Sequence, residues 1–241
     1  MQLKKEFKII LNDLRETPSF LYFLMAFIIL LLEYFGWQGP FYKNIAPIID
    51  YRFTHQEIKL WAQPYTTLSF LLLMVLIPAI VFKWRADLKF EGLSLPYKKE
   101  LGPYLLFAIV MLLILSLVCA QESFYQFYPL YRPKGFTDWM IFELIYLPQF
   151  IAVEFFFRGP ILFALNKRIG RLSIFMMTLP YAIIHIHKPF PEAIGSIFAG
   201  VILCHYSLKS KSIWPGVLLH MTIALGADFF GLYYSGLLSN W

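Results

Sequence analysis

The sequence has few charged residues for its length. Only 15% of its 241 residues are Asp, Glu, Lys or Arg, whereas 59% are hydrophobic and 19% are aromatic. A soluble globular domain carries about 25% charged and about 45–50% apolar residues. A chain of this size cannot hide such an excess of apolar surface in one core, so the composition excludes a soluble enzyme and a disordered chain. The class that remains is a multi-span membrane protein.

The sequence also has few cysteines, no cluster of basic residues and no internal repeat. Cys119 and Cys204 lie inside apolar runs and form no Cys-x-x-Cys motif, so the chain is not a disulfide scaffold. The net charge of +6 comes from scattered Lys and Arg residues, so we expect no nucleic-acid partner. No internal repeat is visible, which weighs against transporters built from inverted repeats.

Apolar runs long enough to cross a bilayer are abundant. A spanning helix needs about 20 mostly apolar residues. The sequence therefore predicts an all-α bundle with seven or eight membrane spans. The seven clearest runs are about 18–37, 64–83, 103–120, 138–167, 172–187, 190–208 and 212–237. The 17 residues before the first run are too long and too mixed in charge for a signal peptide, so we keep that run as a span.

The basic residues predict the orientation of these spans. If the spans alternate, 14 of the 21 Lys and Arg residues fall on the side of the N-terminus. Arg158 lies within a span, and six basic residues fall on the other side: Lys43, Arg52, Lys59, Arg132, Lys134 and Lys188. Cytoplasmic loops carry an excess of Lys and Arg. We therefore expect a cytoplasmic N-terminus, an odd number of spans, and two long outer loops at about 38–63 and 121–137.

Ionisable side chains inside the spans are unevenly distributed. Such groups are costly in lipid, so each is a functional hypothesis. Those of the spans are Glu33, Glu143, Glu154, Arg158, His185, His187, His205, His220 and Asp228. All but one lie in the second half of the chain. We therefore divide one membrane domain into a scaffold, residues 1–136, and a site-bearing part, residues 137–232.

Glu154, Arg158, His185 and His220 are the strongest site candidates. Glu154 and Arg158 are spaced i, i+4 on one helix face, which suits an ion pair, and Pro160 predicts a kink just below them. With a rise of 1.5 Å per residue, Glu154 and His185 each lie about 20 Å from the inner end of their span, so we expect them at one depth in the membrane. The same count places His220 at only about 12 Å.

The remaining polar groups are supporting candidates. Glu192 begins a helix, where the helix dipole favours a carboxylate. Asp228 shares a helix face with His220 and could orient a histidine or pair with a neighbour. His187 points elsewhere than His185 and is expected at the outer interface. The small residues at Ser196/Gly200 and Gly195/Ala199 predict close helix packing.

Three motifs follow one another within about residues 137–232: Val153-Glu154 with Arg158, Tyr181 with His185, and His220 with Ala224. Together they resemble the CAAX-protease and bacteriocin-processing (CPBP, or Abi) family of intramembrane endopeptidases. The family's Glu-Glu-x-x-x-Arg motif corresponds to Val153-Glu154-Phe-Phe-Phe-Arg158. Its Phe-x-x-x-His motif corresponds to Tyr181-x-x-x-His185. Its final histidine, often with Asn four residues later, corresponds to His220 with Ala224.

The resemblance implies a mechanism in which the leading glutamate and the second-motif histidine activate water. The last histidine and its asparagine then stabilise the oxyanion. This sequence has Val153 at the leading glutamate position and Ala224 at the asparagine position. Three interpretations follow. Glu154 acts as the base with His185, another carboxylate such as Glu192 or Asp228 enters the site, or the chain keeps the fold without the chemistry.

The resemblance also implies what the protein acts on and where. We expect a peptidase of peptide or prenylated-protein substrates, with Glu154 as base, His185 as its partner, His220 as oxyanion donor and Arg158 holding Glu154 charged. The alternatives are a non-catalytic membrane binding or scaffold protein and a proton-coupled transporter. No cofactor is expected, although Glu154, His185 and His220 are residue types that could bind zinc. Partners are then membrane lipid and a peptide, in the cytoplasmic membrane of a bacterium.

Overall fold

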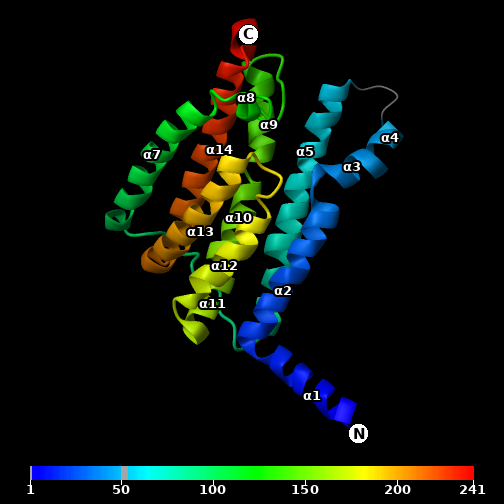
Figure 1. The fold of residues 1–241 in the computed structure, drawn as a ribbon, viewed down its shortest axis with the longest axis vertical. Helices are drawn as coiled ribbons and strands as arrows, with labels where there is room; N and C mark the ends of the chain where they lie inside the picture. The colour runs from blue at the N-terminus through cyan, green and yellow to red at the C-terminus, as the bar shows by residue number, and fades with distance from the viewer. Residues whose placement is uncertain (1, 50–53) are drawn as a thin grey trace.

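The computed structural model describes residues 2–49 and 54–241, and in this part the chain forms a bundle of helices joined by short loops (Figure 1). Six helical stretches are long and apolar enough to cross a membrane: Thr17–Gly36, Glu57–Trp84, Lys98–Val118, Phe136–Ile169, Phe190–Ser210 and Trp214–Tyr234. The predicted all-α membrane bundle is confirmed. The number of spans stays a prediction, because α12 (Leu172–Ile183) has only 12 residues, about 18 Å of helix for a bilayer core of about 30 Å.

The first two stretches lie side by side on one flank of the bundle, and Lys98–Val118 lies on the opposite flank (Figure 1). α1 (Gln2–Arg15) precedes α2 (Thr17–Leu31), which continues as a π-helix to Gly36. The outer loop predicted at 38–63 contains α3 (Gln38–Asn44), α4 (Ala46–Ile49) and the start of α5 (His55–Leu71). Arg52, counted above as an outer basic residue, lies outside the described residues.

The membrane-facing character is clearest in α7 (Gly102–Val118). Its stretch has a mean hydropathy of 2.6, and only 11% of the window is buried inside the bundle. A helix that is apolar all round and unburied by protein must be covered by lipid. α6 (Ile77–Trp84) leads into the loop before it, and α8 (Glu122–Tyr125) lies in the loop after it.

The predicted span 138–167 is divided into three helices. They are α9 (Phe136–Tyr146), α10 (Gln149–Arg158) and α11 (Pro160–Ile169). The kink predicted at Pro160 is confirmed, because α10 ends at Arg158 and Gly159 leaves the helical conformation with ψ −141°. A Cβ at Gly159 would lie 2.3 Å from the Phe155 carbonyl oxygen, so the break requires glycine.

The last three helices close the bundle. α12 ends at Ile183, four residues before the predicted end of its span, so His185 lies in the turn that leads to Pro189. α13 (Phe190–Ser210) packs closely on α12, since a Cβ at Gly200 would lie 2.9 Å from Thr178 Cγ2. Gly195 differs, because a Cβ there would have no atom within 4 Å. The predicted small-residue packing therefore holds for Ser196/Gly200, where Ser196 is also buried, and not at Gly195.

The chain begins and ends at opposite ends of the bundle (Figure 1). α14 (Trp214–Tyr234) runs to the end that also carries α8 and the 184–189 turn, while α1 extends from the other end. Most basic residues therefore gather at the end of the N-terminus. Which end faces the cytoplasm stays a prediction.

Candidate active site

A cavity of about 850 Å³ lies between α7, α10, α12, α13 and α14. Its lining includes His185, His220, Val153 and Ala224, which are the four positions that correspond to the catalytic groups of the resembled family. The sequence motifs, which lie far apart along the chain, therefore meet in one space. Two of these four positions carry apolar side chains.

Glu154 is fully buried beside this cavity and does not line it. Its Oε1 accepts hydrogen bonds from Arg158 Nη1 at 3.1 Å and from His220 Nδ1 at 3.1 Å. Arg158 is also fully buried, and its Cζ lies 3.8 Å from the centre of the Tyr181 ring. The predicted i, i+4 ion pair is present, and His220 extends it into a network of three residues.

Gly216 makes room for the carboxyl group of Glu154. A Cβ at Gly216 would lie 2.6 Å from Glu154 Oε2, well inside van der Waals contact. The first turn of α14, Trp214-Pro215-Gly216, can approach α10 only because residue 216 has no side chain. Since His220 lies one turn further along α14, this close approach also brings its ring to Glu154.

Glu154 uses only one of the two ring nitrogens of His220. A carboxylate can only accept, so Nδ1 donates to Glu154 and Nε2 remains for another partner. The ring packs against Phe150 at a centroid distance of 4.4 Å and against Tyr181 at 6.3 Å. These contacts fix the ring in the cavity wall.

His185 is held in the same way by a different acceptor. Its Nδ1 lies 2.8 Å from the carbonyl oxygen of Tyr181, which only accepts. The neutral ring therefore carries its proton on Nδ1 and a lone pair on Nε2. Its ring centroid lies 4.5 Å from that of Tyr181, so both histidines have Tyr181 as a neighbour.

The structure pairs Glu154 with His220, whereas the depth estimate placed Glu154 level with His185 and well above His220. The estimate was wrong to separate Glu154 from His220, because its depth for Glu154 assumed one straight helix from Lys167 to Glu154. The chain instead breaks at Gly159, so the 13 steps from Glu154 to Lys167 do not add up to one helical rise. The chemical roles assigned to these residues stay predictions.

The supporting candidates occupy two other places. Glu192 lines the same cavity, where its carboxylate accepts from the Tyr128 hydroxyl at 2.8 and 3.0 Å and lies 3.9 Å from Lys188 Nζ. Asp228 is two turns beyond His220 on α14 and does not line the cavity. Its Oδ1 accepts instead from the backbone N–H of Leu130 at 3.1 Å.

Sequence reasoning missed the polar cluster made by Tyr128, Lys188 and Glu192. Burial and the neighbouring Glu192 raise the pKa of the Tyr128 hydroxyl well above its ordinary value, so this group stays protonated and donates. Lys188 Nζ donates to the Tyr128 oxygen at 2.9 Å. The i, i+4 spacing of Lys188 and Glu192 was the available signal, but nothing local indicates Tyr128.

His187 lies apart from His185, as expected for an interfacial residue. Its Nε2 lies 2.9 Å from Glu33 Oε2, and 63% of its side chain is exposed. Glu33 also accepts from the Trp37 indole at 3.1 Å. In the described part of the chain, no three His, Cys, Asp or Glu side chains gather closely enough to hold a metal ion.

Comparison with known families gives one match. Residues 135–226 match the Rce1-like family, described as type II CAAX prenyl endopeptidase Rce1-like. The resemblance found in the motifs is confirmed over this segment, which contains α9 to α13 and the first half of α14. Neither a curated protein nor a solved structure gives a match. With its apolar helices, the chain is an integral membrane protein, and residues 135–226 are similar to the Rce1-like family.

Proposed function

We propose that this protein is an intramembrane endopeptidase in which His185 and His220, both beside the Tyr181 ring, act together. The observation that carries the proposal is the arrangement of the two imidazoles. Both line one cavity, and each has Nδ1 bonded to an acceptor. Each ring therefore offers its Nε2 for chemistry.

His185 is the base in this proposal. Its Nε2 takes a proton from a water molecule, whose oxygen forms a bond to the carbonyl carbon of the scissile peptide. The same Nε2 then gives that proton to the departing nitrogen as the C–N bond breaks. A positioned imidazole of this kind contributes a rate factor of about 10²–10⁴.

His220 is the oxyanion donor, as the resemblance implies, and Glu154 supports it. When Nε2 also carries a proton, the ring is positive, and Glu154 at 3.1 Å from Nδ1 offsets that charge. Arg158 fixes the same carboxylate oxygen. In this proposal Glu154 positions His220 and does not activate water, because its carboxylate does not line the cavity.

The substrate is a peptide whose flanking part is apolar, including a prenylated C-terminal tail. The cavity exposes mostly apolar surface, from residues such as Phe107, Met111 and Ile114 on α7. Its volume of about 850 Å³ lies within the usual range of about 300–1,000 Å³ for a ligand pocket. Polar groups are few, which suits a lipid-attached segment.

A specific observation favours a second candidate function, binding without hydrolysis. Val153 and Ala224 line the cavity at the two positions where the family places a water-activating carboxylate and an oxyanion donor. A protein that only binds apolar peptides needs the cavity but neither group. In this case His185 and His220 line the cavity but take no part in a reaction.

Hydrolysis of a farnesylated peptide by the purified full-length protein tests the first candidate. Mass spectrometry of the released C-terminal fragment gives the rate. We expect His185→Ala to lower kcat by about 10²-fold or more, which is the contribution of a positioned base. His220→Ala should lower kcat similarly, and the matched control His205→Ala, at a histidine that does not line the cavity, should not. Cleavage that survives in His185→Ala contradicts the mechanism.

The second candidate makes a different prediction in the same assay. The wild-type chain then binds the fluorescently labelled farnesyl peptide without cleaving it. Val153→Glu combined with Ala224→Asn should introduce hydrolysis by restoring both groups to the cavity wall. If neither binding nor cleavage of any apolar peptide is seen, both candidates are wrong.

A further inference from the structure

The first helix, α1, leaves the end of the bundle at an angle and packs mainly against the start of α2 (Figure 1). Its apolar residues Phe7, Ile10, Leu11 and Leu14 are spaced i, i+3, i+4 and i+7, which places them on one face of the helix. All four are exposed, from 36% of the surface of Leu14 to 62% of that of Phe7. No part of the described chain therefore covers this apolar face.

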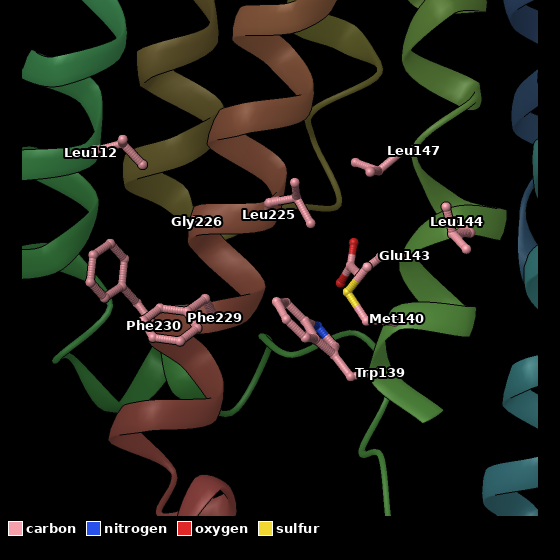
Figure 2. A pocket seen from close by; sticks show the side chains of 10 residues that line it. All are labelled: Leu112, Trp139, Met140, Glu143, Leu144, Leu147, Leu225, Gly226, Phe229 and Phe230. Atoms are coloured by element: carbon pink, nitrogen blue, oxygen red, sulfur yellow. The ribbon is translucent and has the colours of Figure 1, made fainter. Parts of the chain in front are cut away.

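Exposed apolar side chains elsewhere in the bundle belong to membrane-spanning stretches. Leu144 and Phe229, for example, lie around the pocket between α7, α9 and α14, on two such stretches (Figure 2). α1 belongs to none of the six stretches. Its 14 residues make only about 21 Å of helix, whereas the bilayer core is about 30 Å thick. An uncovered apolar face on a helix that cannot cross the membrane marks an interaction site.

The charged residues of α1 are divided between the two flanks of the apolar face. A rotation of about 100° per residue places Lys4, Lys8 and Arg15 on one flank of the helix. The same rotation places Glu6 and Asp13 on the other flank. With four basic residues against two acidic ones, the helix has a net charge of +2. An amphipathic helix with an excess of basic residues is typical of helices that lie on anionic membranes.

The start of α2 fixes the height of α1 in the membrane. Thr17 Oγ1 donates to Asp87 Oδ2 at 2.7 Å. Asp87 lies three residues after Trp84, where the spanning stretch Glu57–Trp84 ends, and 82% of the Trp84 surface is exposed. Tryptophan at the end of a span is typical of the membrane–water interface. The junction of α1 and α2 therefore lies at that interface, and the backbone leaves the helical conformation there, with Glu16 at ψ 136°.

We propose that α1 lies on the membrane surface and binds anionic phospholipid headgroups, with its apolar face in the bilayer and its basic flank on the phosphates. The net positive charge of the helix favours an anionic surface. The position of the junction favours lipid over a soluble partner, because the apolar face begins beside the bilayer. The proposal does not depend on the peptidase activity proposed above.

Spin labels on the full-length protein in nanodiscs test the position of α1. Ile10→Cys places a label on the apolar face, and the matched control Ile9→Cys places one on the opposite face. The native Cys119 and Cys204 are both buried. In nanodiscs of phosphatidylcholine mixed equally with phosphatidylglycerol, a water-soluble nickel chelate should collide several-fold less often with the label at residue 10. Equally frequent collisions at the two positions overturn the proposal.

The lipid composition then tests the role of charge. In nanodiscs of phosphatidylcholine alone, we expect the label at residue 10 to be about tenfold or more accessible to the chelate, because each basic residue near an anionic surface strengthens binding about fivefold. High salt should reduce the effect of phosphatidylglycerol, because it screens charge. The same low accessibility in both lipids would mean that apolar contact alone holds α1, and it would contradict recognition of anionic headgroups.

Charge variants locate the effect on one flank of the helix. The triple variant Lys4→Gln/Lys8→Gln/Arg15→Gln should abolish the dependence on phosphatidylglycerol. The matched control on the other flank, Glu6→Gln/Asp13→Asn, should keep or strengthen it. A dependence that survives in the triple variant contradicts the proposal.

The alternative occupant of the apolar face is a second copy of the chain. Double electron–electron resonance between labels at residue 10 in proteoliposomes measures this. We expect no defined distance between labels of two copies. A short, defined distance would identify the second copy as the occupant and overturn the proposal.

Discussion

Two glutamates of the same apolar stretch, Glu143 and Glu154, are both buried but have opposite surroundings. Glu154 accepts two hydrogen bonds from groups that can carry positive charge, and it lies beside the histidine cavity. Glu143 forms no ion pair with a basic side chain of the described residues and lies near another acid, Asp228. The difference teaches that burial of a carboxylate alone indicates little about its role. The groups that meet it from neighbouring helices decide that role.

Removing the cation from the satisfied site should have the largest effect. Arg158→Met leaves Glu154 buried without its strongest partner, and breaking a buried pair costs about 3–5 kcal/mol. Thermal unfolding of the detergent-purified protein measures this. The double variant Glu154→Leu/Arg158→Met should recover much of the loss, because it leaves no buried charge. If Arg158→Met is as stable as the wild type, the ion pair does not stabilise the fold.

The close approach of α14 to Glu154 should be nearly as sensitive. Gly216→Ala places a methyl group 2.6 Å from Glu154 Oε2, and overpacking of this kind costs about 1–3 kcal/mol. It should also displace His220 and lower hydrolysis. Gly195→Ala is the matched control, because a Cβ there meets no atom within 4 Å. Equal effects at the two positions would show that helix propensity, and not the Glu154 contact, sets the outcome.

The same substitution at the two glutamates should give opposite results. Glu154→Gln weakens two charge-assisted bonds, so we expect destabilisation of about 1–3 kcal/mol. Glu143→Gln adds an amide donor that can bond to Asp228, so stability should be unchanged or rise by about 1 kcal/mol. Side-by-side melting curves of the two variants measure the difference. Equal destabilisation would mean that Glu143 has a partner after all.

A carboxylate at the aqueous end of the bundle should show the smallest effect. Asp87 accepts from Arg85 at 2.8 Å and from Thr17 at 2.7 Å, and these bonds hold its pKa well below the ordinary value. An exposed pair of this kind contributes about 0–1 kcal/mol, so Asp87→Asn should cost no more.

The sign of its pH dependence follows from the lowered pKa. The stabilisation by Asp87 is complete above the unfolded-state pKa of about 4 and is lost as the pH falls through the folded-state pKa. The difference in melting temperature between the wild type and Asp87→Asn should therefore be constant at neutral pH and shrink only in strong acid. A difference that grows as the pH falls would contradict this assignment.

Local patterns in the sequence predicted much of the fold. The apolar runs predicted an all-α membrane bundle, because hydropathy over about 20 residues is a local property. Pro160 predicted the break after Arg158. The division of the chain at Pro148 and the early end of α12 at Ile183 were not predicted, because an apolar composition continues across both.

The site was only half predictable for a related physical reason. The motif residues Glu154, His185 and His220 were found from their order and spacing, but their partners were not. Which side chains meet depends on the rotation and tilt of helices that are distant in the sequence. Gly216 is the clearest case, since its importance appears only once α14 lies against α10. The Glu143–Asp228 pair likewise joins helices that are 85 residues apart in the sequence.

The composition and motifs alone predicted that this protein lies in a membrane and which residues carry its polar chemistry. A chain with few charges among many apolar residues is stable only in a membrane. Burying a polar group in lipid costs free energy, so each polar group inside the spans can be considered as a site candidate. The tertiary structure decided which of those groups are satisfied. Glu154 is hydrogen-bonded to His220 and Arg158, whereas Glu143 lies near Asp228. A hydrogen bond needs two atoms within about 3 Å, and only helix packing sets that distance.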